Sequence, residues 1–323
     1  MSLLVELIRG KLLSFIKILL NFFLIENEIA KVIFLTNILS RMNEYFADTN
    51  GIKLCYKEYG NKDNYPIIGI HGFGSKKETW IAQVGELSKN YRIIIYDQRG
   101  AGKSDRPDKP PYTMDMFVDD IKGLMDYLNI EKSHILGRSM GGMIAQNFVV
   151  KYPEKVNKLM LITTGPGGIR SPAGSDVFKN NQIDRTKKIL INPEKVFWKD
   201  TRFGFYVKFR KEMMADPKKK FYGIWSVEDL IKYIQDNPPR PQDIEYFINV
   251  MNTQNAFDKL GQIKHKTLVL SASHDKMVPK VAGEYLHSLL PNSIFKVIEE
   301  AGHECHYSRA PEVNKIILDF LQD

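Results

Sequence analysis

The sequence predicts an α/β fold with a mostly parallel central sheet, helices on both faces of that sheet, and a helical cap insert. After residue 45, short β-branched runs bounded by Gly, Asp or Asn alternate with helical patterns. The runs "RIIIY" (Arg92–Tyr96) and "KLMLIT" (Lys158–Thr163) are apolar almost throughout, as expected for strands buried on both faces. Alternation of such strands with helices is typical of a parallel sheet covered on both sides.

Each expected strand is a short apolar run, and a helical pattern over Met116–Leu128 and another over Met140–Lys151 lie between them. The expected strands are Ile52–Glu58, Pro66–His71, Arg92–Asp97, His134–Gly137, Lys158–Thr163, Thr267–Ser271 and Ile294–Ile298. The alternation stops at Gly165, in a linker rich in Gly, Pro and Ser, and aromatic-rich helical stretches follow to about Asp258. The predicted segments are an apolar N-terminal helical extension (1–45), the first part of the core (46–164), a helical cap (165–258) and the second part of the core (259–323).

The bulk composition excludes several classes of protein. The chain has 323 residues and a net charge of +8, without a concentrated basic stripe or a nucleic-acid-binding signature, so we expect no nucleic-acid partner. Its two cysteines, Cys55 and Cys305, provide no disulfide framework. A reducing compartment, the cytoplasm, is therefore the expected location.

The first 41 residues differ from the rest in composition. Leu12–Ile25 is apolar but is interrupted by Lys17 and Asn21, and it is shorter than the roughly 20 residues that a membrane-spanning helix needs. On a helix, the polar residues of this region would form a narrow stripe beside a broad apolar face. Three interpretations stay open: a helix on a membrane surface, giving peripheral membrane contact, a helix docked on the protein itself, or a segment upstream of a natural start at Met42.

Gly102-Lys103-Ser104 matches the end of a nucleotide-binding phosphate loop, G-x-x-x-x-G-K-[ST]. That motif needs a glycine five residues before Gly102, where this chain has Asp97, and a helix directly after the serine. Ser104 is instead followed by three prolines in seven residues, which exclude the regular helix whose N-terminus would bind phosphate. We therefore reject the NTPase interpretation.

A candidate nucleophile lies in Gly137-Arg138-Ser139-Met140-Gly141, which is G-x-S-x-G between an apolar strand and a helix. The tight, strained turn of this motif lifts the serine hydroxyl clear of the sheet. Side chains at positions 137 and 141 would collide with the neighbouring strand and helix, so glycine is needed there. Ser139 is therefore the predicted nucleophile.

Position along the chain selects a base and an acid for this serine. His303 follows the last expected strand, and Asp275 follows the strand before it. The order Ser139, Asp275, His303 places each group at the carboxyl end of a strand, the edge where ligand sites of open α/β sheets lie. We expect His303 to be the general base and Asp275 to orient it.

An oxyanion hole needs two amide donors that point toward the reacting carbonyl. The Met140 N–H lies at the predicted start of a helix, directly after the nucleophile. A second donor is expected from the sharp loop His71-Gly72-Phe73-Gly74, where the strand Pro66–His71 ends. Phe73 and Met140 are therefore the predicted oxyanion-hole residues.

With these pieces the chain resembles the α/β-hydrolase superfamily over roughly residues 46–323. It looks like the serine-nucleophile branch that holds carboxylesterases, enol-lactonases, C–C bond hydrolases and methyl esterases of carrier-protein esters. The resemblance implies hydrolysis of a small carboxylic ester or lactone through an acyl-enzyme, without a cofactor. Cleavage of an enol-lactone or a 1,5-diketone is the alternative, and acyl transfer or ligand reception on the same fold also stays open. Family members carry a D-x-R-G-x-G-x-S turn, here Asp97–Ser104, whose role in the family is architectural.

Arg138 departs from this branch, where the position is often His. Its guanidinium could favour an anionic substrate or could pair with a neighbouring carboxylate. The cap segment Lys199–Lys220 holds eight Lys or Arg against three Asp or Glu, either as a solvated basic face or as a docking surface for an acidic carrier or an anionic acyl group. The oligomeric state stays open.

We expect the other reactive side chains near the predicted site to take no direct part in the reaction. His71 is expected to support the oxyanion loop, and His274 and His306 to be polar residues near the rim of the site. Cys305 lies on the histidine loop and not on a nucleophile turn. His303 and His306 lack two further ligands at a recognisable spacing, so no metal site is expected.

Overall fold

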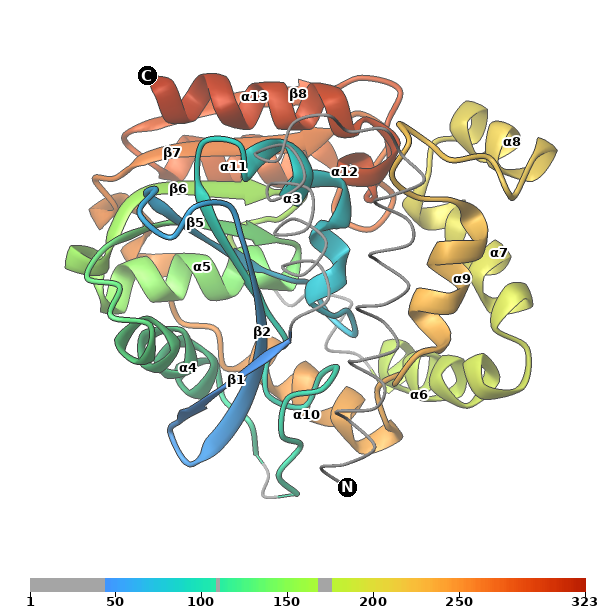
Figure 1. The fold of residues 1–323 in the computed structure, drawn as a ribbon, viewed down its shortest axis with the longest axis horizontal. Helices are drawn as coiled ribbons and strands as arrows, with labels where there is room; N and C mark the ends of the chain where they lie inside the picture. The colour runs from blue at the N-terminus through green and yellow to red at the C-terminus, as the bar shows by residue number, and fades with distance from the viewer. Residues whose placement is uncertain (1–43, 109–110, 168–175) are drawn as a thin grey trace, which may run out of the picture. The chain divides into compact units, whose positions relative to one another are not determined.

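The computed structural model describes residues 44–108, 111–167 and 176–323, and residues 44–323 form one compact unit. The described residues contain a central eight-stranded sheet with the strand order β1-β2-β4-β3-β5-β6-β7-β8 (Figure 1). Its strands are β1 (Tyr45–Thr49), β2 (Ile52–Tyr59), β3 (Pro66–Ile70), β4 (Arg92–Tyr96), β5 (Ser133–Arg138), β6 (Val156–Ile162), β7 (Lys266–Ala272) and β8 (Ser293–Ile298). β1 pairs antiparallel with β2, β2 pairs antiparallel with β4, and every other pairing is parallel. The predicted α/β fold with a mostly parallel sheet is therefore confirmed.

The seven predicted strands are present with slightly shifted ends, and β1 was not predicted. β1 and β2 form a hairpin whose two turn residues, Asn50 and Gly51, both have positive φ (50° and 73°). An Asn-Gly pair in this conformation gives the type I′ turn whose twist matches that of the flanking strands. The dipeptide itself was the signal in the sequence that could have revealed β1.

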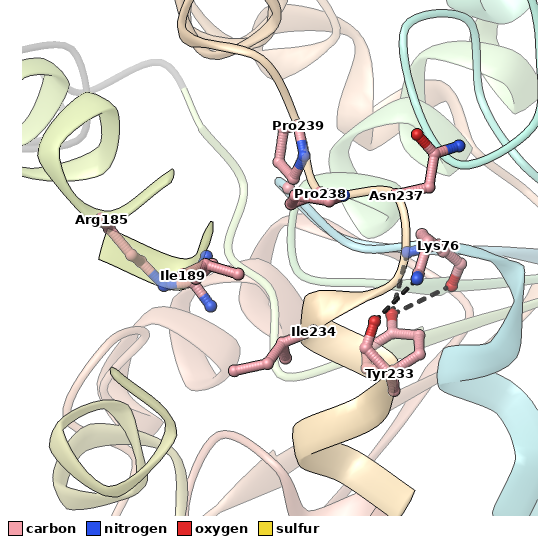
Figure 2. Close-up of a pocket in the computed structure, with 9 residues that line it drawn as sticks. Lys76, Arg185, Ile189, Tyr233, Ile234, Asn237, Pro238 and Pro239 are labelled. Carbon is pink, nitrogen blue, oxygen red and sulfur yellow. Dashed lines mark hydrogen bonds between the residues drawn. The ribbon is translucent and has the colours of Figure 1, made fainter. Parts of the chain in front are cut away.

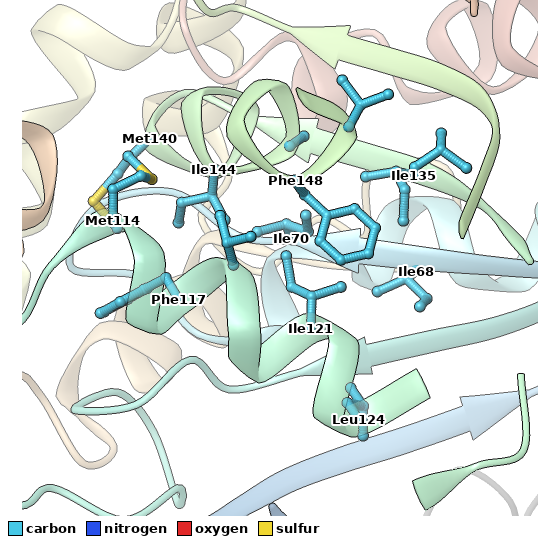
Figure 3. Close-up of a cluster of buried hydrophobic side chains, with 14 of the residues drawn as sticks. Ile68, Ile70, Met114, Phe117, Ile121, Leu124, Ile135, Met140, Ile144 and Phe148 are labelled. Atoms are coloured by element: carbon cyan, nitrogen blue, oxygen red, sulfur yellow. The ribbon is translucent and has the colours of Figure 1, made fainter. Parts of the chain in front are cut away.

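Both faces of the sheet are buried, each against its own set of helices. Neighbouring residues of one strand belong to different hydrophobic clusters: Ile68 and Ile70 face one cluster and Ile67 the other. The first cluster packs against α4 (Met114–Tyr127), α5 (Met140–Lys151) and α11 (Lys280–Leu289), as Figure 3 shows for α4 and α5. The second cluster packs against α3 (Ile81–Leu87) and α13 (Ala310–Gln322). Burial on both faces explains the continuous apolar runs in the sequence.

The two helical patterns read from the sequence are α4 and α5. α5 has the predicted bounds, whereas α4 begins two residues earlier than expected. The Thr113 hydroxyl accepts a hydrogen bond from the Met116 N–H, so Thr113 is the N-cap and the helix begins at Met114.

The described residues between β6 and β7 form a series of helices. They are α6 (Asp176–Ile191), α7 (Pro193–Gly204), α8 (Val207–Ala215), α9 (Val227–Gln235) and α10 (Pro241–Asn252). Aromatic side chains of α7, α8 and the following turn pack with Ala82, Tyr307 and Ala310 of the core, whereas Phe247 of α10 joins the cluster on α4 and α5. The insert therefore shares its apolar interior with the sheet layer.

The predicted N-terminal extension 1–45 lies outside the described residues, apart from Glu44 and Tyr45. None of the helices in the described part of the chain combines the length and the hydropathy needed to cross a membrane.

Candidate active site

Ser139 lies on a strained turn between β5 and α5. Its backbone has φ 53° and ψ −123°, a conformation that a residue with a side chain adopts only when its surroundings impose it. The surroundings here are very close. A Cβ atom at Gly137 would lie 2.4 Å from the Gly141 carbonyl oxygen, and one at Gly141 would lie 2.2 Å from the Ile70 carbonyl oxygen. Glycine at both positions lets helix α5 approach strands β5 and β3 closely enough to force this turn.

Asp275 and His303 form a buried pair at the same edge of the sheet. Asp275 follows β7 and His303 follows β8, and the distance from His303 Nδ1 to Asp275 Oδ2 is 2.7 Å. The other carboxylate oxygen, Oδ1, accepts hydrogen bonds from the N–H groups of Met277 and Val278 at 2.8 and 2.9 Å. Asp275 is thus held on both oxygens, and it holds the imidazole so that Nε2 is the ring nitrogen left for chemistry.

Two consecutive threonines at the end of β6 connect the serine turn with the histidine loop. The Thr164 hydroxyl donates to the Ser139 carbonyl oxygen at 2.8 Å, and the Thr163 hydroxyl donates to the His303 carbonyl oxygen at 3.4 Å. The Ser139 N–H also donates to the Ile162 carbonyl oxygen at 3.0 Å. Within residues 44–108, 111–167 and 176–323, Ser139 Oγ and His303 Nε2 make no hydrogen bond with each other. The backbones that carry these two side chains are nevertheless tied to one short segment, Thr163–Thr164.

The predicted oxyanion loop lies directly beside the serine turn. A Cβ atom at Gly72 would be 3.3 Å from Ser139 Cβ, so a larger residue there would press on the nucleophile. In the described part of the chain, the N–H groups of Phe73 and Met140 donate no hydrogen bond to another protein group. Met140 is the first residue of α5, where the helix dipole adds positive potential. Both amides are therefore available to a ligand oxygen.

The oxyanion loop continues past Gly74 to Lys77, and the turn Asp97–Ser104 anchors both ends of this segment, His71–Lys77. At the first end, His71 Nε2 accepts from the Gln98 N–H at 3.1 Å, and Gln98 Nε2 donates to the His71 carbonyl oxygen at 2.6 Å. At the second end, Asp97 accepts hydrogen bonds from the N–H and the Nζ of Lys77, both at 2.8 Å. Burial lowers the pKa of His71, so its imidazole stays neutral and can accept at Nε2. His71 thus supports the loop, as expected from the sequence.

Lys103, the lysine of the Gly-Lys-Ser tripeptide, takes no part in this site. Its N–H donates to Asp97 Oδ2 at 2.9 Å, and its half-exposed side chain pairs with Glu44 at 2.5 Å. Ser104 donates to the Asp97 carbonyl oxygen at 2.5 Å and accepts from the Cys55 N–H at 2.8 Å. The contacts of this turn are all internal to the protein and hold β2, β4 and the oxyanion loop together.

Arg138, directly before Ser139, pairs with a carboxylate. The distance from its Nη2 to Glu304 Oε1 is 2.5 Å, and the same nitrogen donates to the His303 carbonyl oxygen at 3.4 Å. Arg138 is only 5% exposed. Of the two alternatives for Arg138, the structure thus contains the pairing with a neighbouring carboxylate. Sequence reasoning named no partner, because Glu304 lies far away in the chain.

The prediction that His306 lies near the rim of the site is wrong. His306 is fully buried, with Nε2 3.2 Å from the Thr79 hydroxyl and its ring packed edge-on against Trp80. Burial holds its pKa well below the usual value, so the ring is neutral. His274, by contrast, is exposed and packs against Tyr206. His306 therefore belongs to the packing beneath the histidine loop.

Further reactive side chains near the predicted site are Cys305 and the possible metal ligands. Cys305 is buried, and burial raises the pKa of its thiol to about 12, so the thiolate that would act as a nucleophile is not formed near neutral pH. In the same described part of the chain, no three His, Cys, Asp or Glu side chains are grouped so that they could hold a metal ion.

Comparison with known proteins identifies the family. The family described as the alpha/beta hydrolase fold matches residues 65–185 and 222–310. A 2-hydroxy-6-oxononadienedioate/2-hydroxy-6-oxononatrienedioate hydrolase from Comamonas testosteroni is 30% identical over 264 residues, which cover 79% of this chain and 87% of that protein.

Two solved structures share the fold. The enol-lactonase from Burkholderia xenovorans LB400 matches with a TM-score of 0.71 at 23% identity, over 86% of this chain and 100% of that chain. A thermophilic esterase from Thermogutta terrifontis, with malate bound, matches with a TM-score of 0.70 at 24% identity, over 87% of this chain and 98% of that chain.

Proposed function

Because the chain belongs to the α/β-hydrolase family, we propose that it is a serine hydrolase that cleaves carboxylic esters through an acyl-enzyme on Ser139. One observation carries the proposal: the 2.7 Å contact between His303 and Asp275, next to the strained turn that presents Ser139. A nucleophile, a base and a group that orients the base are the minimum for this chemistry.

The first half of the reaction forms the acyl-enzyme. His303 Nε2 takes the proton of the Ser139 hydroxyl as Oγ bonds to the ester carbonyl carbon. The negative charge that develops on the carbonyl oxygen is stabilised by the N–H groups of Phe73 and Met140. When the tetrahedral intermediate collapses, the bond to the alcohol oxygen breaks, and the imidazolium returns its proton to the leaving alcohol. Asp275 stabilises the imidazolium and holds its tautomer without taking the proton.

The second half uses the same groups on water. His303 removes a proton from the water molecule as its oxygen bonds to the acyl carbon, and the same two amides hold the new oxyanion. Breaking the bond from the acyl carbon to Ser139 Oγ releases the carboxylic acid and returns the proton to the serine. Water supplies both the oxygen and the proton, so the cycle needs no cofactor.

Hydrolysis of a carbon–carbon bond is a second candidate, because the Comamonas testosteroni relative, at 30% identity, is named as a hydrolase of 2-hydroxy-6-oxononadienedioate and 2-hydroxy-6-oxononatrienedioate. In that reaction the water oxygen again ends on the acyl carbon, but the leaving group is a carbon atom that must be protonated. The same serine, base and amides would serve the acyl half of the reaction.

A substrate panel separates the two candidates. The purified chain and Ser139→Ala are assayed in parallel with p-nitrophenyl esters of graded acyl length, an enol-lactone, and 2-hydroxy-6-oxo-6-phenylhexa-2,4-dienoate. We expect ester hydrolysis by the wild type and none by the variant. Consumption of the dienoate with no ester hydrolysis would favour the second candidate. Equal ester hydrolysis by the Ser139→Ala variant would overturn both.

A further inference from the structure

The oxyanion loop is held in two different ways along its length. Its ends, His71 and Lys77, are bound by the core turn at Asp97 and Gln98. Its middle, Phe73–Lys76, contacts the helical insert. Phe73 packs against Phe178 of α6 and Phe247 of α10, with ring centroids 5.5 and 5.8 Å apart. Phe73, which is predicted to supply one oxyanion donor, therefore lies in the part of the loop that contacts the insert.

Tyr233 of α9 makes the polar contacts to this half of the loop. Its hydroxyl lies 2.7 Å from the Ser75 hydroxyl and accepts a hydrogen bond from the Lys76 N–H at 2.9 Å. The Lys76 ammonium donates to the carbonyl oxygens of Tyr233, at 2.7 Å, and of Asp236. Figure 2 shows the Lys76 and Tyr233 side chains meeting at the C-terminal end of this helix. Burial raises the pKa of Tyr233, so its hydroxyl remains protonated.

A small pocket lies beside these contacts. A small cavity of about 20 Å³ separates Gly74 and Lys76 from Arg185 and Ile189 of α6, and Tyr233 lines it as well (Figure 2). Gly74 itself has a positive φ of 60°, which gives the loop a turn that a larger residue would resist. Besides the ring packing of Phe73, the hydrogen bonds of Tyr233 therefore restrain the loop on this side.

We infer that Tyr233 is a positioning residue that sets the orientation of the Phe73 N–H through Ser75 and Lys76, so that the helical insert completes the oxyanion hole. The inference rests on the proposed function. The peptide plane between Gly72 and Phe73 lies between the part of the loop bound by the core and the part bound by Tyr233. The carbonyl oxygen of that plane, Gly72 O, accepts a hydrogen bond from the Ser75 N–H at 3.3 Å and lies 2.9 Å from His71 Nδ1, so the plane is held from both sides. Releasing Ser75 loosens one of these two restraints, and a donor that is misaligned with the developing oxyanion loses most of its effect.

The test measures the reactivity of Ser139 with a fluorophosphonate, which needs the oxyanion hole and is independent of the natural substrate. Oγ displaces fluoride at phosphorus while the serine proton passes to His303, and the phosphoryl oxygen takes the place of the oxyanion. For Tyr233→Phe we expect the maximal inactivation rate to fall ~10-fold, since outright removal of a donor costs on the order of 10²–10³. The fluorophosphonate concentration that gives half of the maximal rate should be unchanged, because no oxyanion has yet formed in the initial complex.

Two further variants separate positioning from general loosening of the insert. Tyr222→Phe is the matched control, because the Tyr222 hydroxyl also joins the insert to the core, by donating to the Ser308 carbonyl oxygen at 2.6 Å, but makes no contact with the loop. It should label at the wild-type rate. Ser75→Ala removes one of the three contacts of the Tyr233 hydroxyl, the other two being with the N–H and the carbonyl oxygen of Lys76, and should slow labelling by a smaller factor. The double variant with Tyr233→Phe should be no slower than Tyr233→Phe alone, because the two changes remove one shared interaction.

The possible outcomes are distinct. Wild-type labelling rates in both Tyr233→Phe and Ser75→Ala would overturn the inference and leave the proposed function intact. An equal loss in Tyr222→Phe would assign the effect to loosening of the insert and would also overturn it. A wild-type chain that is not labelled at all would overturn the proposed function and this inference with it. If Tyr233→Phe does not fold, the comparison of Ser75→Ala with Tyr222→Phe decides the question.

Discussion

The sheet edge and the helical insert contribute to the candidate site in different ways. The edge carries the predicted reacting groups, each in the loop that follows a strand: Ser139 after β5, Asp275 after β7 and His303 after β8. Their contacts are short and local to this edge: Asp275 accepts from the N–H groups of Met277 and Val278 in its own loop, and the Thr164 hydroxyl, just past β6, donates to the Ser139 carbonyl oxygen. The insert supplies none of these groups. It contacts the oxyanion loop through Tyr233 and Phe178.

This difference teaches where large and small effects are to be expected. Groups that form or break bonds act on the barrier directly, whereas groups that hold a loop act only through its alignment. Substitutions at the sheet edge should therefore change the rate by orders of magnitude, and substitutions in the insert by a factor of ten or less. The predictions below test this contrast, from the largest expected effect to the smallest.

The largest effect is expected for Ser139→Ala, which removes the nucleophile. Ester hydrolysis and fluorophosphonate labelling should both be lost, because no acyl-enzyme or phosphoryl-enzyme can form. Ser273→Ala is the control, because Ser273 follows β7 at the same edge of the sheet and lies outside the turn around Ser139. This variant should keep both ester hydrolysis and labelling. Labelling of the Ser139→Ala protein at a different serine, mapped by peptide mass spectrometry, would show that the nucleophile has been assigned wrongly.

Asp275→Asn should leave the fold intact and lower kcat by roughly 10⁴-fold, as the same change of the triad aspartate does in serine proteases. The amide oxygen can keep the two hydrogen bonds from Met277 and Val278, whereas the NH₂ group would face His303 Nδ1. The imidazole would then carry its proton on Nε2 and could not accept one from Ser139. Rates and melting temperatures are compared with those of Asp258→Asn, an exposed site. A near-normal rate in Asp275→Asn would place the orienting acid elsewhere.

An intermediate effect is expected when the Arg138–Glu304 pair is broken. Arg138→Met should lower the free energy of unfolding by about 2 kcal/mol, since it leaves a partly buried carboxylate without its partner. Adding Glu304→Gln should recover part of the loss. Arg309→Met, which breaks an exposed pair with Glu300, should cost less than about 1 kcal/mol. The measurement is denaturant unfolding. An unchanged unfolding midpoint in Arg138→Met, with a raised KM for anionic esters only, would favour a role in substrate recognition instead.

The smallest effect is expected in the basic segment of the insert, which we propose attracts anionic substrates or an acidic carrier. Lys218 and Lys219 are exposed, and reversing their charge should raise KM a few-fold for an anionic ester and leave a neutral ester of equal length unchanged. Lys220 is kept, because it pairs with Asp229, whose carboxylate belongs to the N-terminal cap of α9. Equal changes for both esters would mean that the segment is simply a solvated face of the protein.

Local spacing explains why the candidate site could be predicted in part from the sequence. The turn around Ser139 depends on glycines two residues to either side, and this pattern is visible without any knowledge of the fold. Asp275 and His303 were found because each directly follows an apolar run that reads as a strand. The groups that align them carry no such local mark. Thr163 and Thr164, for example, are an ordinary pair of threonines until the end of β6 places them between Ser139 and His303.

By itself, then, the sequence determined the mostly parallel sheet, seven of its eight strands, the helices α4 and α5, and the three predicted reacting groups after strand ends. Those features follow from hydrophobic periodicity and from residues close together in the chain. Only the tertiary structure decided that Glu304 neutralises Arg138, that His306 is buried, and that Tyr233 reaches Ser75 from 158 residues away. The physical reason is that a hydrogen bond or an ion pair between distant residues depends on how whole elements pack, and the apolar pattern that drives the packing does not specify which polar groups will meet.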